Sequence, residues 1–181
     1  MDPVAVIERY YAPGSASRRI LLEHGQLVAR KALAAAARVS RLQPDPAFIE
    51  SAAMLHDIGI FLTRSPGLGC RGGEPYIRHG LLGRQLLDAL NLPRHGLVCE
   101  RHVGVGLSAE EIRRNRLPLP ERDMVPISIE EQIICYADKF YSKNENGGAP
   151  QEKTIDRIVD GLRPYGADKV ERFLAWAALF G

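Results

Sequence analysis

The chain has 181 residues, of which 45% are hydrophobic and 25% charged, proportions that exclude the disordered and fibrous classes and suit a soluble globular protein. Its 24 basic and 22 acidic residues leave a formal charge of +2, too small an excess to make nucleic acid an obligatory partner. Because a chain of this length typically forms one domain, we expect residues 1–181 to be a single domain.

The N-terminal segment, MDPVAVIERYYAPGS, lacks the basic region and the apolar run of a secretory signal. No stretch of the chain approaches the ~20 consecutive apolar residues that cross a bilayer. The three cysteines, Cys70, Cys99 and Cys135, are widely spaced and form no C-x-x-C pair, which argues against disulfides and against a zinc–thiolate site. These features predict a cytoplasmic protein that does not contact membranes.

Two helices are predicted in the first third of the chain. Segment 16–39 is rich in Ala, Leu and Arg, and its apolar residues recur at helical spacing, so it predicts one long helix that carries His24. A second helix is expected to begin at Pro46, because proline is tolerated at the first helical position and Asp45 can cap the free amides. This helix should end at the His-Asp pair of the sequence AAMLHDIGI, before the following glycine.

A segment dense in glycine and proline comes next. Residues 63–75 (TRSPGLGCRGGEP) predict a loop, which we expect to be the most mobile part of the chain. Residues 76–90 carry a helical stripe of apolar side chains that Asn91 closes before a proline. A shorter predicted helix, 94–103, carries His102.

Further helix starts are indicated by two S-x-x-E sequences. In each, serine and glutamate are expected to form a capping box by satisfying each other's backbone amides, namely Ser108 with Glu111 and Ser128 with Glu131. The connection 115–127 predicts an extended surface loop, and two C-terminal helices are expected at about 152–162 and 166–179. Since no alternation is long enough to build a sheet, the predicted fold class is all-α, a compact helical bundle.

The His-Asp pair is the strongest chemical feature of the sequence. His56 and Asp57 offer an imidazole nitrogen and a carboxylate oxygen within reach of one divalent ion. Adjacent ionisable groups inside an apolar run need partners, and a metal ion supplies them. A lone histidine such as His95 is more often a packed or solvent-facing residue, and we do not expect it to be a ligand.

This text resembles the HD phosphohydrolase superfamily in its HDIG variant. The family is named for an H…HD…D set of ligands on an all-helical core, and His24 in LLEHGQLVA and Asp138 in CYADKFY stand where the outer members are expected. The resemblance covers roughly residues 16–142. It implies an HD-domain helical bundle on which C-terminal helices at about 152–179 pack.

Two further histidines lie between the pair and the last aspartate, and family members with two extra histidines in this interval bind a dinuclear centre. The resemblance implies that Asp57 bridges the two ions and is the catalytic residue. The other implied metal ligands are His24, His56 and Asp138 on one ion and His79 and His102 on the second. The ions are expected to be divalent transition metals, iron or manganese, with cobalt, nickel and zinc left open.

Two departures from family patterns narrow the substrate. Ile60 stands where many HD hydrolases carry a lysine. The segment HVGVGLS, which begins at His102, stands in place of the GYP signature of cyclic-di-GMP phosphodiesterases, so that substrate is not expected. Arg78, Arg101 and Lys139 are the predicted substrate-binding residues, because guanidinium and ammonium groups match phosphate oxygens. A solvated charged surface is an equal alternative for these three.

The resemblance implies a metal-dependent phosphohydrolase that attacks a nucleotide or another small phosphate ester with a metal-activated hydroxide. One alternative is a dinuclear-iron oxygenase of the HD type that cleaves a C–C or C–P bond. Another is a non-catalytic domain that senses a nucleotide or a metal. The C-terminal segment around Trp176 either packs on the core, which we expect, or forms a homodimer contact.

Overall fold

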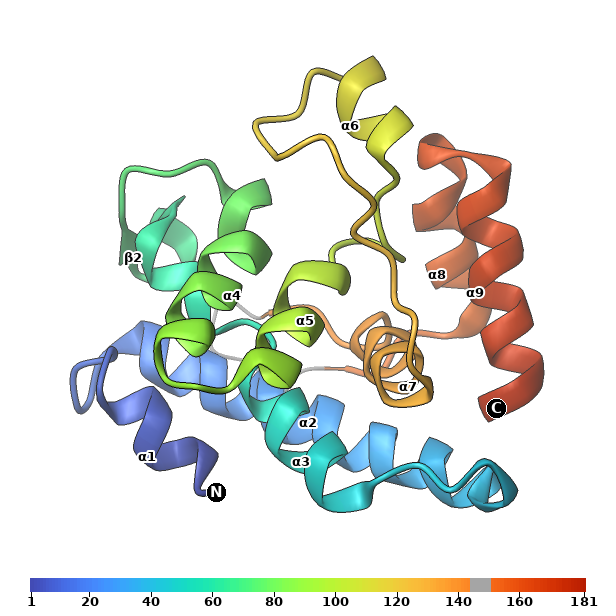
Figure 1. Ribbon diagram of the computed structural model, residues 1–181, viewed down its shortest axis with the longest axis horizontal. Coiled ribbons are helices and arrows are strands. Elements are labelled where there is room, and N and C mark those ends of the chain that lie inside the picture. Colours follow the sequence, from blue (N-terminus) through green and yellow to red (C-terminus); the bar gives the residue numbers. More distant parts are fainter. Residues whose placement is uncertain (144–150) are drawn as a thin grey trace.

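Figure 1 shows the computed structural model, which describes residues 1–143 and 151–181. The α-helices in chain order are α1 (Pro3–Glu8), α2 (Ala16–Arg38), α3 (Pro46–Leu55), α4 (His79–Ala89), α5 (Pro93–Arg101), α6 (Ala109–Arg114), α7 (Ile129–Asp138), α8 (Ile155–Leu162) and α9 (Ala167–Phe180). Two short strands, β1 (Arg64–Ser65) and β2 (Cys70–Arg71), pair antiparallel. Short 3₁₀ turns cover Ser40–Leu42, Ile58–Leu62, Pro66–Leu68, Tyr76–Arg78 and Arg163–Tyr165. The predicted all-α fold class is confirmed.

Helix α2 runs along the base of the molecule in Figure 1 and packs against α3 and α7. Ser15 begins it by accepting a hydrogen bond from the Arg18 N–H, and buried side chains then recur every three or four positions. Most of these buried residues are small, and Gly25 lies directly against the backbone of Met54 in α3. The stripe that packs the core therefore also turns the neighbouring His24 inward.

Helix α7 lies at the centre of the molecule, where α2, α3, α5 and α9 all contact it. Its Ile133, Ile134 and Ala137 are fully buried in the largest apolar cluster. The C-terminal helices extend that cluster, because the ring of Phe173 in α9 stacks on Tyr136 of α7 at 5.7 Å. This packing fixes the end of α7, where Asp138 lies.

Two elements were not predicted from the sequence. Helix α1 is capped by Asp2, and after it the Tyr11 hydroxyl donates a hydrogen bond to the Ile58 carbonyl at 2.9 Å. Within segment 63–75, predicted as a loop, β1 and β2 form a short hairpin. Strands of two residues leave no alternation of side chains to detect.

The two predicted capping boxes have different outcomes. The box of Ser108 and Glu111 is complete at the start of α6. At the start of α7, the Ser128 hydroxyl accepts from the Glu131 N–H as expected, but the Glu131 carboxylate accepts from the Ile127 N–H instead of the Ser128 N–H. The second box is therefore only half formed.

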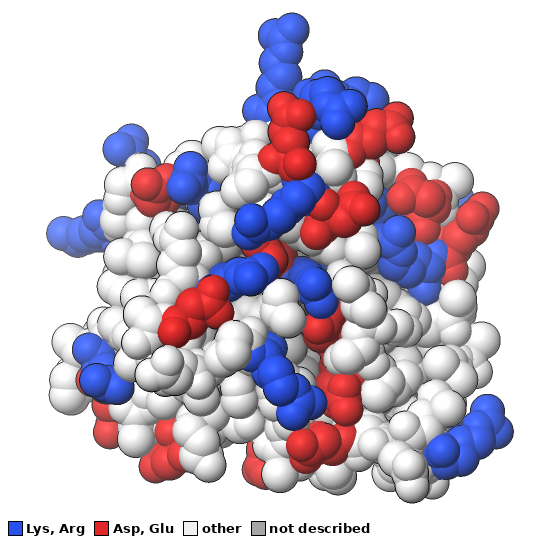
Figure 2. Space-filling view, viewed as in Figure 1, with Lys and Arg blue, Asp and Glu red and all other residues white. Residues whose placement is uncertain are grey.

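The surface offers no sign of a dominant charge on the face shown in Figure 2, where basic and acidic side chains are interspersed. This agrees with the nearly balanced composition of the chain. Among the residues that the structure describes, no helix combines the length and the apolar character needed to cross a membrane.

Candidate metal centre

Six buried histidine and aspartate side chains meet where five helices converge. They are His24 from the middle of α2, His56 and Asp57 at the end of α3, His79 at the start of α4, His102 at the end of α5 and Asp138 at the end of α7. All six are less than a tenth exposed. The structure thus brings together every residue that the sequence predicted as a metal ligand.

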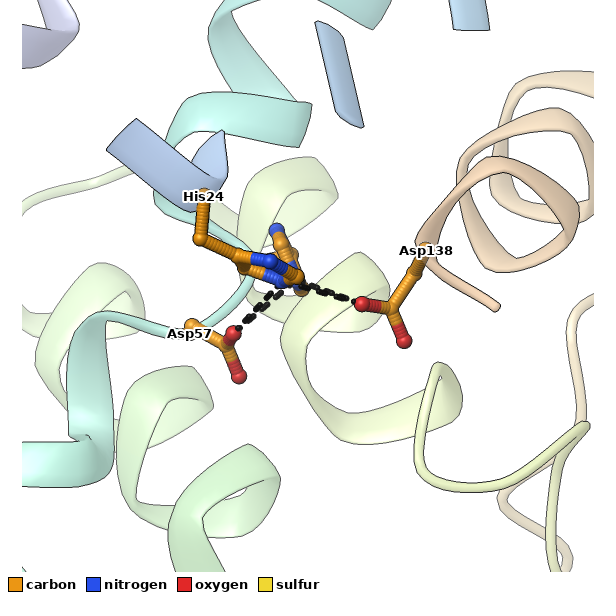
Figure 3. Close-up of side chains that lie close together, drawn as sticks. His24, Asp57 and Asp138 are labelled. Carbon is orange, nitrogen blue, oxygen red and sulfur yellow. Dashed lines mark hydrogen bonds and ion pairs between the residues drawn. The ribbon is translucent and has the colours of Figure 1, made fainter. Parts of the chain in front are cut away.

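Four of these residues form the first half of the centre: His24, His56, Asp57 and Asp138. The Nε2 atom of His24 lies 3.2 Å from His56 Nε2 and 3.0 Å from Asp138 Oδ1. Figure 3 shows His24 between the two aspartates, which approach it from α7 and from the end of α3. Two imidazoles and two carboxylates therefore aim at one small volume.

The second half consists of His79 and His102 with the same Asp57. The two Nε2 atoms are 3.1 Å apart, and they lie 3.3 and 3.4 Å from Asp57 Oδ1. The other oxygen, Oδ2, faces the first half, at 3.1 Å from His56 Nε2. Asp57 is therefore shared, with one carboxylate oxygen directed to each half.

Backbone carbonyls orient three of the four imidazoles. His56, His79 and His102 each donate Nδ1–H to the carbonyl three residues earlier, at 2.6, 2.7 and 2.8 Å. In a neutral ring this leaves an Nε2 lone pair directed into the centre, as in histidines that bind metal. His79 and His102 would then face each other through two lone pairs, an arrangement that a cation stabilises.

The donor set fits a divalent transition metal. Imidazole nitrogens and carboxylate oxygens are the ligands that manganese, iron, cobalt, nickel and zinc accept. Among the described residues, neither buried oxygen of Asp57 accepts a hydrogen bond of good geometry, and buried polar atoms normally have a partner. An ion in each half would satisfy both oxygens.

The electrostatic environment keeps the two carboxylate ligands in the ionised state that suits a metal. Burial raises the pKa of Asp57, but the charges of His56 and Lys143 outweigh this and hold the pKa well below its usual range. The same holds for Asp138, whose pKa is lowered chiefly by Lys139 against the effect of burial. Both carboxylates are therefore ionised at neutral pH.

A cavity of about 490 Å³ opens beside the centre, and Asp138 lies in its wall. Lys143 Nζ lies 2.7 Å from Asp57 Oδ2, and Lys139 Nζ lies 2.8 Å from Asp138 Oδ2. Tyr76, from the turn before α4, also lines the cavity. Two ammonium groups thus stand between the buried carboxylates and solvent.

Lys143 was not among the residues predicted from the sequence. The residue comes five positions after Asp138, beyond the last residue of α7, so helical spacing does not place its side chain. The signal in the sequence was a basic residue close to a predicted ligand in KFYSKN, which many surface segments share.

The three predicted substrate-binding residues lie in different surroundings. Lys139 lines the cavity next to the centre. Arg78 forms an ion pair with Glu74 at 3.0 Å, and Arg101 donates to both oxygens of Glu131 at 2.9 Å. Neither arginine lines that cavity, so for both a substrate contact stays a prediction.

Comparisons with known sequences agree with this geometry. The sequence model of the HD domain family matches residues 21–142, an interval that contains all six ligand-type residues. An uncharacterized protein of Methanocaldococcus jannaschii is 33% identical over 123 residues, which are 66% of this chain and 65% of that protein.

Two tRNA (cytidine(56)-2'-O)-methyltransferases also match. The Picrophilus torridus protein is 34% identical over 99 residues, covering 54% of this chain and 25% of the relative. The Thermoplasma volcanium protein is 29% identical over 154 residues, covering 84% of this chain and 39% of the relative. The chain spans less than two thirds of the length of each of these curated relatives.

Solved structures show a similar fold. The HD domain of the L. monocytogenes phosphodiesterase PgpH matches with a TM-score of 0.54 and 15% identity, covering 96% of this chain and 94% of that one. The same domain in complex with cyclic-di-AMP matches with a TM-score of 0.53 and 16% identity, covering 96% and 92%. At these identities the likeness concerns the fold alone.

Proposed function

The chain belongs to the HD domain family, and from this membership we propose that it is a metal-dependent phosphohydrolase acting on a nucleotide or another small phosphate ester. The observation that supports this most directly is the sharing of Asp57 between two groups of buried nitrogen and oxygen donors. Such an arrangement suits two ions that act together on one phosphoryl group. Cyclic-di-AMP, bound by a structural neighbour, makes nucleotides the first class to test.

In this proposal each side chain has a distinct task. His24, His56 and Asp138 would hold one ion and His79 and His102 would hold the other, with Asp57 belonging to both groups of ligands. Bound divalent ions supply Lewis acidity and lower the pKa of a water ligand. Lys139 and Lys143, which line the cavity beside the centre, bind the phosphate oxygens of the substrate and so position it at the centre.

Lys143 has a further role in the proposal. Its ammonium group is within 2.7 Å of Asp57 Oδ2, so in the metal-free protein it balances part of the carboxylate charge. With a metal bound at Asp57, the Lys143 ammonium group would no longer be needed there and would be free to bind the substrate. Lys143 would thus provide the positive charge that many HD hydrolases have in a lysine directly after the HDIG sequence, where this chain has Ile60.

The test combines metal analysis with an activity panel. Protein purified without oxygen and loaded with Mn, Fe, Co or Ni would be offered nucleoside monophosphates, cyclic dinucleotides and bis(p-nitrophenyl) phosphate. We expect two ions per chain and release of phosphate or of the ester product, both lost in Asp57→Ala, where the rate should fall by about three orders of magnitude or more.

Several outcomes would contradict the proposal. No hydrolysis by any loaded form across the panel would count against a hydrolase. Oxygen consumption by the iron form, with a mixed-valent iron signal, would favour the oxygenase instead. Tight nucleotide binding without turnover, unchanged in Asp57→Ala, would favour a sensing domain.

A further inference from the structure

A second, smaller cavity of about 220 Å³ adjoins the larger cavity beside the metal centre. Lys139 and Lys153 line both cavities, so the two share a wall. Arg157 lines the smaller one from the first turn of α8. Gly161, one turn further along α8, leaves open space where a side chain would stand. The smaller cavity therefore continues the larger one away from the six ligand-type residues.

The basic residues of the smaller cavity differ from those at the metal centre in their ion-pair partners. Lys143 and Lys139 each contact a buried carboxylate, on Asp57 and Asp138. In contrast, neither Lys153 nor Arg157 forms an ion pair with any acidic residue in the described parts of the chain (1–143 and 151–181). Two positive charges without an acidic partner among the described residues favour an anionic ligand at this place.

The acidic neighbour of Lys153 in sequence, Glu152, is engaged elsewhere, and Asp156, next to Arg157, forms no ion pair with it. Its carboxylate accepts a hydrogen bond from Lys31 Nζ at 2.5 Å and another from the Tyr141 hydroxyl at 2.8 Å. These contacts draw Glu152 toward α2. Burial lowers the pKa of Lys153, and the repulsion of Lys139 and Arg157 adds to this against the attraction of Asp138. An anion beside Lys153 would relieve that repulsion.

Hydrogen bonds fix the backbone of both residues. The Lys153 N–H donates to the Phe140 carbonyl at 2.9 Å, which ties this residue to the end of α7, two residues past Asp138. Thr154 then caps α8 by accepting from the Arg157 N–H at 3.3 Å. Little backbone ordering is therefore left to oppose ligand binding.

We propose that Lys153 and Arg157 form a subsite for a second phosphate group of the substrate, whose first phosphate lies at the metal centre. This rests on the proposed phosphohydrolase function. A guanidinium and an ammonium group are the usual partners of phosphate oxygens. The substrate is therefore a nucleotide with at least two phosphates. These are joined either directly, as in a nucleoside diphosphate, or through a ribose, as in an oligonucleotide.

Three related ligands test the subsite by binding. Adenosine monophosphate, adenosine diphosphate and adenosine 3',5'-bisphosphate share the base and one phosphate and differ in the presence and position of the second. Dissociation constants would be measured by calorimetry on metal-loaded protein, for the wild type and for Lys153→Gln, Arg157→Gln and the double variant. The matched control is Arg163→Gln, because Arg163 is exposed, pairs with Asp160 and lines neither cavity.

We expect the wild type to bind one of the two bisphosphates at least about tenfold more tightly than the monophosphate, the usual value of a hydrogen bond between charged groups. The double variant should lose this advantage and bind the monophosphate within about twofold of the wild type. The control should retain it. Loss for the diphosphate assigns directly linked phosphates, and loss for the 3',5'-bisphosphate assigns phosphates spaced by a ribose.

Equal affinity of wild-type protein for all three ligands would overturn the subsite. So would an advantage for a bisphosphate that persists in the double variant. Because the readout is binding, it does not depend on turnover. Absence of hydrolysis would count against the proposed function and leave this test to decide the subsite separately.

Discussion

The two halves of the metal centre share Asp57 and differ in the charge around them. In the first half, His24 and His56 face Asp138 as well as Asp57. In the second half, His79 and His102 face the shared carboxylate alone. Two anions in one half and one in the other imply different affinities for a cation, and we expect the first half to hold its ion more tightly.

The two halves also differ in their readiness to bind. Burial lowers the pKa of His56, but Asp57 and Asp138 outweigh it and raise the pKa to about 10. For His79 burial prevails over the attraction of Asp57 and lowers the pKa to about 3. An ion entering the first half must therefore displace a proton from His56, whereas both imidazoles of the second half are already neutral.

The largest effect on metal content and rate is expected when both histidines of the second half are replaced. Replacing both His79 and His102 by Gln should reduce the metal content from two ions to one, because Asp57 with the first half still offers four donors. Hydrolysis should fall by at least about two orders of magnitude, since one of two cooperating Lewis acids is lost. Elemental analysis and initial rates would measure both effects.

The matched control is His95→Gln. His95 forms a hydrogen bond with the Ser51 hydroxyl at 3.0 Å and packs on Phe48, away from the six ligand-type residues. Its substitution should leave metal content and rate unchanged. Two ions retained by the double variant would show that the second half is not a metal site.

A smaller effect is expected where the backbones of the two halves touch. A Cβ added at Gly59, two residues after Asp57, would lie 2.3 Å from the His79 carbonyl oxygen and 2.4 Å from the Gly83 nitrogen. Gly59→Ala must therefore push α4 away, and we expect it to cost about 1–3 kcal/mol of unfolding free energy. It should also weaken metal binding by separating His79 from Asp57.

Urea denaturation and metal titration of Gly59→Ala would be compared with Gly73→Ala. A Cβ at Gly73 meets no atom within 4 Å, so this substitution should be nearly neutral. If both variants were equally stable, the contact of Gly59 with the backbone of α4 would not be needed to hold the two halves together.

Much of this arrangement could be predicted from the sequence, because it depends on local signals. Asp45 marks a helix start, and the apolar stripe of 16–39 places His24 on the buried face of α2. The order of the six ligand-type residues allowed the family resemblance to be recognised. The structure places these six residues together, while their role as ligands stays a prediction.

Two of the side-chain contacts that were missed join segments distant in the sequence or beyond the end of a helix. The Lys143 side chain reaches Asp57 from beyond the end of α7. Glu131 leaves its expected capping partner while it pairs with Arg101, a residue 30 positions earlier. Neither outcome has a periodic pattern in the sequence, because each is decided by which side chains the packed helices bring together.

The smallest expected effect is a difference in the pH dependence of stability after chelation of metals. The pKa of His56 is raised in the folded state, so its stabilising contribution is full below about pH 6.5 and declines as the pH rises toward 10. The pKa of His79 is lowered, so this residue destabilises the fold increasingly as the pH falls from about 6.5 toward 3.

Urea denaturation between pH 5 and 9 in the presence of a chelator would therefore distinguish the two halves. The unfolding free energy should change with pH by up to about 1.4 kcal/mol per pH unit. His56→Gln should lose most stability relative to the wild type at pH 6 and less at pH 9. His79→Gln should gain on the wild type as the pH falls from 7 to 5. If the unfolding free energies of His56→Gln and His79→Gln had the same pH dependence, the prediction would be wrong. Asp138 would then not give the two halves different electrostatic effects on folding.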